Sequence, residues 1–105
     1  MSALRVARLD ALWDGEMRGF QVGGRKLLLV KLDGQVFAYE DRCAHLGVPL
    51  SQGRLEAELI TCSAHHYQYC ARSGAGVNPR AVRLRAFPVA IDDGWVAVDL
   101  ASEGV

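Results

Sequence analysis

The chain has 105 residues, with twelve basic and twelve acidic side chains, so its formal net charge is zero. This balance argues against a protein that binds nucleic acid through phosphate contacts, since such proteins usually show a clear basic excess. No apolar run approaches the about 20 residues that span a bilayer, and the N-terminus lacks the apolar stretch of a secretion signal, so we expect a cytoplasmic single domain over residues 1–105.

A short turn and a β-hairpin are the first elements expected along the chain. Asp10 is placed to cap one helical turn over residues 11–13. Residues 26–32 and the alternating run of residues 35–40 flank Asp33-Gly34. An Asp-Gly pair between two such runs is a strong hairpin signal. The first half of the chain therefore predicts β-structure with a single helical turn.

The second half of the chain is also predicted to be mostly β. Residues 59–61 form a short strand-like run, and the composition of residues 72–79 is that of a loop. Asp92-Asp93-Gly94 separates the expected strands over residues 87–91 and 95–98. Many short strands joined by regular turns favour an all-β sandwich or a small barrel.

Two short motifs combine cysteine with histidine. Cys43-Ala44-His45 is followed, after sixteen residues, by Cys62-Ser63-Ala64-His65. Each half supplies one thiolate and one imidazole. In a Rieske centre one iron takes two Cys ligands and the other takes two His ligands. The spacing therefore predicts one Rieske-type [2Fe–2S] cluster bound by Cys43, His45, Cys62 and His65.

Three other interpretations of these residues compete with the cluster. The cysteines could be ordinary core residues beside unrelated histidines. A structural zinc site also uses two Cys and two His, but zinc-finger spacing places the two Cys together and the two His together. A nucleophilic Cys62 beside a histidine would leave the first motif unused. The pairing of each Cys with one His favours the iron–sulfur cluster over all three.

The chain resembles the soluble bacterial Rieske ferredoxins, and within them the ferredoxin component of toluene monooxygenase, a four-component diiron system. The stretches that carry the resemblance are residues 9–17, the two ligand motifs and residues 74–79. Ser63 and His66 depart from the commoner Cys-Pro-x-His-Gly pattern, as they do in the toluene monooxygenase ferredoxins. The resemblance implies an all-β antiparallel sandwich with a small inserted cluster-binding subdomain, approximately residues 41–80.

The resemblance also implies a function, which is that of an electron carrier and not of an enzyme. An NADH-dependent flavin and iron–sulfur oxidoreductase would reduce it, and the diiron hydroxylase of a toluene-type monooxygenase would accept the electron. The alternatives are a ferredoxin of a ring-hydroxylating dioxygenase, a nitrite reductase small subunit and, most remotely, a zinc-binding module. We expect a monomer without a membrane or nucleic-acid partner. The expected docking residues are Leu46, Gly47, Val48, Pro49, His66 and Tyr67.

The roles of a few further residues are predicted from their types. Cys70 is expected to be a buried structural thiol, and Trp13 and Trp95 to be core or half-core anchors. His66 is a solvated neighbour of the cluster or a residue that contacts a partner. Respiratory Rieske proteins carry a disulfide between their ligand loops, which this chain lacks, so a potential near the lower end of the Rieske range, about −150 mV, is expected.

Overall fold

The protein is described by a computed structural model covering residues 3–22, 24–42, 49–63, 67–78, 80 and 82–100. Its strands are β1 (Ala3–Arg8), β2 (Glu16–Val22), β3 (Arg25–Leu32), β4 (Gln35–Glu40), β5 (Arg54–Glu56), β6 (Leu59–Thr61), β7 (Gln68–Cys70), β8 (Gly76–Asn78), β9 (Ala86–Phe87), β10 (Val89–Asp92) and β11 (Trp95–Asp99). Two 3₁₀ turns, η1 (Leu9–Ala11) and η2 (Leu50–Gln52), are the helical elements of the described chain. No helix in the described chain has the length and apolar character needed to cross a membrane.

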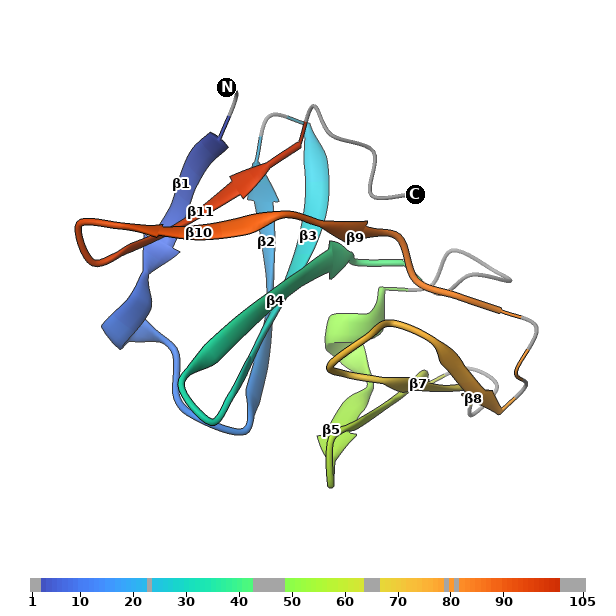
Figure 1. Ribbon diagram of the computed structural model, residues 1–105. Coiled ribbons are helices and arrows are strands. Elements are labelled where there is room, and N and C mark those ends of the chain that lie inside the picture. Colours follow the sequence, from blue (N-terminus) through green and yellow to red (C-terminus); the bar gives the residue numbers. More distant parts are fainter. Residues whose placement is uncertain are drawn as a thin grey trace.

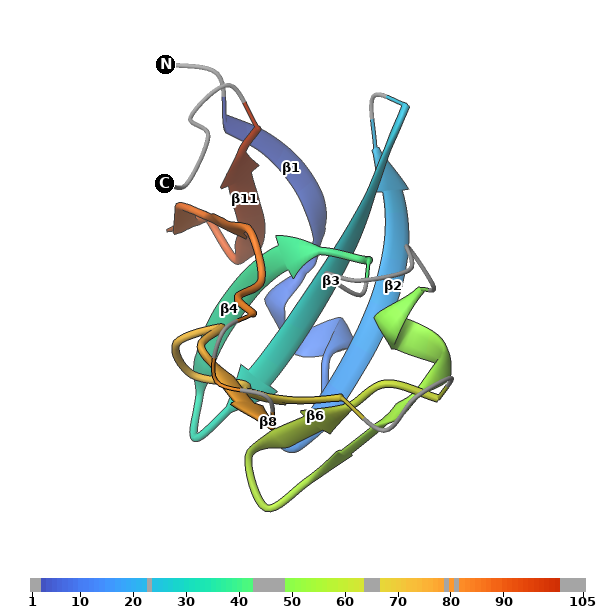
Figure 2. The ribbon, with the colours of Figure 1, turned by 90° about the vertical axis from the view of Figure 1, so that its right-hand side faces the viewer.

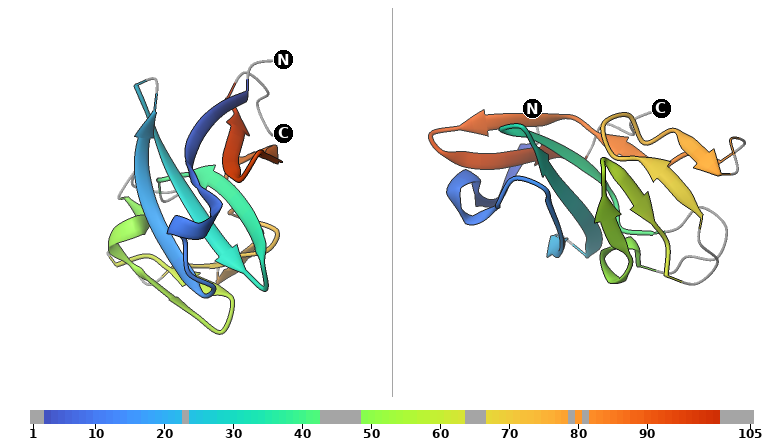
Figure 3. Two further views of the ribbon diagram at one scale, coloured as in Figure 1. Left: turned by 90° about the vertical axis from the view of Figure 1, so that its left-hand side faces the viewer. Right: turned by 90° about the horizontal axis from the view of Figure 1, so that it is seen from below.

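The strands form three antiparallel sheets, which confirms the predicted all-β fold. The first sheet has the order β1-β11-β10, the second β2-β3-β4-β9 and the third β5-β6-β7-β8. The second sheet lies between the other two, with the β10–β11 hairpin on one side and β5–β8 on the other (Figures 1 and 2). The view from below separates the three groups of strands most clearly (right panel of Figure 3).

Strand β3 explains why the middle sheet can be covered on both faces. Leu27 and Leu29 belong to one buried cluster, together with Val96 of the first sheet. Leu28 and Val30 belong to the other cluster, which extends into the third sheet. Because successive side chains of a strand point to opposite faces, a strand buried on both sides must be apolar throughout. All four of these side chains are fully buried.

The two predicted hairpin turns are confirmed. Asp33 and Gly34 connect β3 to β4 with φ values of 51° and 78°, and Asp93 and Gly94 connect β10 to β11 with 52° and 81°. Two consecutive residues with positive φ define the turn whose twist matches that of the flanking strands. Aspartate tolerates this region better than most residues, and glycine does so without strain.

Three local predictions are corrected by the structure. Asp10 lies inside η1, and the residue at the capping position is Arg8, which makes no side-chain cap. Part of the predicted loop 72–79 forms β8, because it pairs with β7. The single strand expected over residues 87–91 is divided at Pro88, which has no N–H to donate, so that β9 joins the second sheet and β10 the first.

Polar contacts attach the third sheet to the middle one. The Tyr39 hydroxyl on β4 donates to the carbonyl oxygen of Ala71 at 2.7 Å. Arg72 donates to Glu58 at 2.9 Å and also to Asp33 in the β3–β4 turn. The hydrogen bonds from Arg72 lower the pKa of the Glu58 carboxyl and raise that of the guanidinium. The third sheet falls within residues 41–80; the boundaries of the predicted subdomain remain a prediction.

Candidate metal centre

Cys62 directly follows strand β6 and is the predicted ligand that the structure describes. Its side chain is fully buried, within the cluster that also contains Leu50 and Tyr69. The Cys62 N–H donates to the carbonyl oxygen of Tyr67 at 2.8 Å. This hydrogen bond closes the segment from Cys62 to Tyr67 at its base, and the predicted ligand His65 lies within that segment. The described residues on either side of positions 64–66 are therefore joined by a hydrogen bond at the end of β6.

The other predicted ligands, Cys43, His45 and His65, lie outside the described residues, so the ligand set remains a prediction. Its chemistry fits the site, since a fully buried thiol at a strand end is suited to bind a metal as a thiolate. An open hollow next to Cys62 is lined by Gln52, Gly53, Arg54, Thr61, Cys62 and Ser63. Within the described part of the chain, no group of three or more Cys, His, Asp or Glu side chains forms another candidate metal site.

The first motif is bracketed by two residues that bind each other. Asp41 ends up buried just after β4, with 6% of its surface exposed. Its two carboxylate oxygens accept hydrogen bonds from the backbone N–H and the hydroxyl of Ser51, at 2.8 and 2.7 Å. Residues 42–50, which include Cys43 and His45, therefore begin and end at one hydrogen-bonded pair.

The turn that contains Ser51 also contacts the strand leading to the second motif. Gly53 follows η2 and donates its N–H to the Leu50 carbonyl at 2.9 Å. A Cβ atom on Gly53 would lie 1.9 Å from the carbonyl oxygen of Thr61, the residue before Cys62. Only glycine allows this approach of one backbone to another. The segment from Ser51 to Gly53 thus touches the chain beside both ligand motifs.

Sequence reasoning missed Asp41, Ser51 and Gly53. Asp41 and Ser51 are ten positions apart. This separation matches no repeat of a helix or a strand, so the sequence does not indicate that the two residues meet. Gly53 did carry a signal, since an isolated glycine near a strand often marks a close backbone approach.

The remaining predictions about single residues have mixed outcomes. Trp13 is 76% exposed, so the prediction of an anchor in the core is wrong. Trp95 is half-buried, as predicted, with the guanidinium groups of Arg5 and Arg8 at 5.8 and 5.5 Å from the ring centre. Cys70 is half-buried and not fully buried. A hydrogen bond from the Ser73 side chain is the main cause that lowers the pKa of its thiol.

Comparison with known proteins decides the family. A family model of the Rieske [2Fe-2S] domain matches residues 2–88. The chain belongs to the Rieske [2Fe–2S] domain family. The predicted resemblance to Rieske ferredoxins and the prediction of one Rieske-type [2Fe–2S] cluster are thereby confirmed, and the zinc-binding alternative is set aside.

Two characterised relatives cover most of this Rieske chain. It is 42% identical over 94 residues to the ferredoxin component of the alkene monooxygenase system of Xanthobacter autotrophicus, which covers 89% of this chain and 77% of the relative. It is 35% identical over 101 residues to the ferredoxin component of biphenyl 2,3-dioxygenase of Rhodococcus jostii, covering 95% and 94%. Both relatives are ferredoxins, so this Rieske protein is an electron carrier.

Solved structures agree with this assignment. The ferredoxin of carbazole 1,9a-dioxygenase from Nocardioides aromaticivorans superposes with a TM-score of 0.84 at 31% identity, covering 93% of this chain and 97% of that one. A ferredoxin solved in complex with the oxygenase of carbazole 1,9a-dioxygenase gives a TM-score of 0.83 at 29% identity, covering 92% of both chains. The described sheets are therefore those of a Rieske ferredoxin.

Proposed function

We propose that this ferredoxin carries single electrons from an NADH-dependent flavin and iron–sulfur oxidoreductase to the diiron hydroxylase of a toluene-type hydrocarbon monooxygenase. The carrying observation is the 42% identity to the ferredoxin of an alkene monooxygenase system, which exceeds the 35% identity to a biphenyl dioxygenase ferredoxin. Ser63 and His66 in the second motif favour the same choice. On this proposal the protein has no substrate of its own.

We further propose that Cys43, His45, Cys62 and His65 hold the cluster. When bound, a Rieske cluster supplies reversible one-electron transfer at a potential above that of all-cysteine clusters, because neutral imidazoles add no negative charge to the oxidised centre. The protein contributes a buried thiol at Cys62 and closed bases for both loops. These features fix Cys62 and the described residues at the bases of both loops, which favours the ordered ligand set that a metal site requires.

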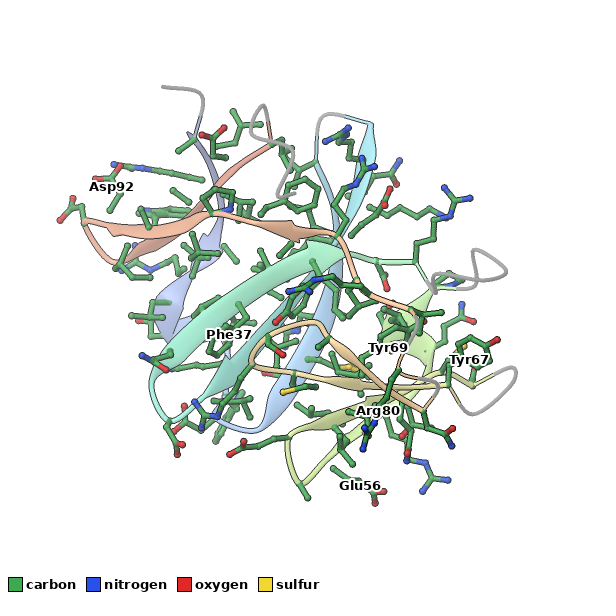
Figure 4. All side chains as sticks on the ribbon, turned by 45° about the vertical axis from the view of Figure 1, so that its right-hand side comes forward. Phe37, Glu56, Tyr67, Tyr69, Arg80 and Asp92 are labelled. Carbon is green, nitrogen blue, oxygen red and sulfur yellow. The ribbon has the colours of Figure 1, made fainter. Side chains whose placement is uncertain are left out.

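The docking surface is proposed at the end of the molecule that carries the two motifs, around Pro49 and Tyr67 of the described chain and the neighbouring residues 46–48 and His66. Exposed arginines flank this end: Arg42 precedes Cys43, and Arg54, which pairs with the exposed Glu56 at 3.7 Å, lines the hollow beside Cys62. Figure 4 shows Arg80 and Tyr67 on one side of the molecule and Asp92 on the opposite side.

The exposed guanidinium of Arg42 beside the first motif supports an acidic patch on the partner surface, although the net charge of the chain is zero. The exposed Asp92 and Asp93 lie at the tip of the β10–β11 hairpin, on the side of the molecule opposite β7 and β8 (Figure 1). Positive charge at the docking end orients a carrier toward an acidic surface before contact and raises the rate of association at low salt. Electron-transfer complexes are typically small, under about 1,200 Å² of buried surface, so such steering is useful to them.

The identity of the acceptor can be tested by stopped-flow reoxidation of the reduced ferredoxin. Chemically reduced protein is mixed with the diiron hydroxylase of a toluene monooxygenase or with the oxygenase of biphenyl dioxygenase, and the return of the oxidised visible spectrum is followed. Faster transfer to the diiron hydroxylase supports the proposal. Transfer only to the dioxygenase would overturn it in favour of the dioxygenase alternative.

The docking surface can be tested in the same assay with charge variants. Arg42→Gln and Arg54→Gln should slow reoxidation and flatten its dependence on ionic strength, while the visible spectrum stays intact. Arg5→Gln is the matched control, since Arg5 pairs with Asp92 on an exposed surface away from the motifs. Equal effects of the three variants would contradict docking at the motif-bearing end.

A further inference from the structure

Asp41 is an unusual residue in this protein because it is a buried carboxylate. In the described part of the chain it is the one charged side chain that is buried, with 6% of its surface exposed. Burying a charge is unfavourable unless hydrogen bonds compensate for the lost water. The partners that compensate Asp41 are therefore informative, because Asp41 stands two positions before the proposed ligand Cys43.

Ser51 satisfies both oxygens of this carboxylate. Its backbone N–H donates to Asp41 Oδ1 at 2.8 Å, and its hydroxyl donates to Asp41 Oδ2 at 2.7 Å. Asp41 is itself anchored to the middle sheet, because its N–H donates to the carbonyl oxygen of Lys26 at 3.0 Å. Asp41 therefore links Ser51, which follows residues 42–50, to strand β3 of the middle sheet.

Gly19 on β2 provides the space for this pair. A Cβ atom at Gly19 would lie 2.8 Å from Asp41 Oδ2 and 2.8 Å from Ser51 Oγ. Both distances are well below ordinary van der Waals contact, so any side chain at this position would push the two residues apart. The middle sheet therefore leaves room for the Asp41–Ser51 pair at Gly19 and also binds Asp41 through a backbone hydrogen bond.

Gly53 and Arg54 connect the Asp41–Ser51 pair to the strand that precedes the second motif. Gly53 packs its backbone against the carbonyl oxygen of Thr61, and the next residue, Arg54, pairs with Thr61 across β5 and β6. Thr61 immediately precedes Cys62. A shift of Ser51 would consequently move the chain beside both motifs, and metal ligands must keep their positions to within about 0.5 Å.

We propose that Asp41 and Ser51 are positioning residues for the iron–sulfur cluster. Their pair fixes the base of the loop that carries Cys43 and His45, and the turn through Gly53 keeps that loop in register with Cys62. Closing the loop at its base also reduces the number of conformations it can adopt. This inference rests on the proposed ligand set and deepens it, since it assigns the support of that set to residues that do not bind iron.

The test compares the holoprotein with the variants Asp41→Ala, Asp41→Asn and Ser51→Ala. Three quantities are measured: the rate at which a chelator removes iron below the unfolding temperature, the electron paramagnetic resonance spectrum of the reduced protein, and the midpoint potential. Residues that orient metal ligands typically change metal affinity about 10- to 100-fold when mutated, and Asp41 would orient the ligands through the base of their loop. We expect iron loss to accelerate to that extent in Asp41→Ala, and resonance and potential to change. Asp41→Asn, which keeps one acceptor oxygen, should be partly rescued.

Val96→Ala serves as the control for a purely structural effect. Val96 is fully buried in the cluster between the first and second sheets, so its truncation destabilises the fold without touching the pair. Its iron should leave slowly and its resonance should remain that of the wild type. If Val96→Ala and Ser51→Ala lose iron equally fast at equal thermal stability, or if Ser51→Ala keeps the wild-type resonance and potential, the proposal is overturned. Ser51→Ala keeps its backbone hydrogen bond, so the test survives if Asp41→Ala does not fold.

A further pair of variants separates this inference from the ligand assignment on which it rests. Cys43→Ser and His45→Ala should abolish the Rieske resonance if these residues bind the cluster. If they retain it, the proposed ligand set is wrong. If they lose it while Asp41→Ala behaves like Val96→Ala, the ligand set stands and only the positioning role fails.

Discussion

Replacing Tyr39 with phenylalanine removes one hydroxyl group from the junction between two sheets. Tyr39 is buried, with 2% of its surface exposed, and its hydroxyl donates to the carbonyl oxygen of Ala71 at 2.7 Å. Ala71 is fully buried. The ring of phenylalanine fills the same space, so the expected cost is that of the hydrogen bond and of the acceptor left without this donor, about 1–3 kcal/mol.

This cost should be visible in thermal unfolding of the holoprotein. A loss of 1 kcal/mol lowers the melting temperature of a domain of this size by about 4–8 °C. Scanning calorimetry or near-ultraviolet circular dichroism would measure it. A Tyr39→Phe protein that melts with the wild type at neutral pH would refute the reasoning, because the hydrogen bond would then contribute nothing to the attachment of the third sheet.

The stability difference between the wild type and Tyr39→Phe should also depend on pH. Burial is the main cause that raises the pKa of Tyr39, with the neighbouring charge of Cys70 adding to it and Arg83 opposing it. The pKa of Tyr39 is higher in the folded than in the unfolded protein. The contribution of its neutral hydroxyl to the free energy of unfolding is therefore complete below a pH of about 10 and is lost as the pH rises above it. The difference between wild type and Tyr39→Phe should therefore shrink in the alkaline range. A difference that grows there would contradict the assignment.

The remaining predictions concern a glycine, a thiol and a tryptophan. Gly53→Ala should destabilise the protein more than Gly15→Ala. Alanine at position 15 would meet open space and carry only the strain of a φ of +81°, about 1–2 kcal/mol. Urea midpoints that rank the two variants the other way would count against the close approach at Gly53. Ser73→Ala removes the hydrogen bond that lowers the pKa of the Cys70 thiol, so alkylation of Cys70 in the holoprotein should slow at neutral pH, and an unchanged pH profile of alkylation would speak against this cause. Trp13→Ala should change the free energy of unfolding by no more than about 0.5 kcal/mol, since the side chain is 76% exposed; a larger loss in denaturant titration would show that the ring packs.

Features that depend on neighbouring residues or on exact spacing could be predicted from the amino-acid sequence. Asp33-Gly34 and Asp93-Gly94 specify their turns because the required positive φ values are a local property of these two residue types. The spacing of the two Cys and His motifs predicted the cluster, since each half supplies a donor of each kind. The run over residues 26–32 predicted a strand, although not that both of its faces are covered.

Tertiary structure alone decided the features that join distant parts of the chain. β8 is a strand because β7 lies beside it, and Trp13 is exposed although its residue type is typical of a core. The Asp41–Ser51 pair forms because the fold brings two residues that are ten positions apart next to each other, where Ser51 donates to the buried Asp41 carboxylate. None of these is periodic or local, and the energy of each depends on burial and on partners that exist only once the sheets have packed. The sequence thus predicted the Rieske-type cluster, while packing decided which buried residues lie beside the two Cys and His motifs.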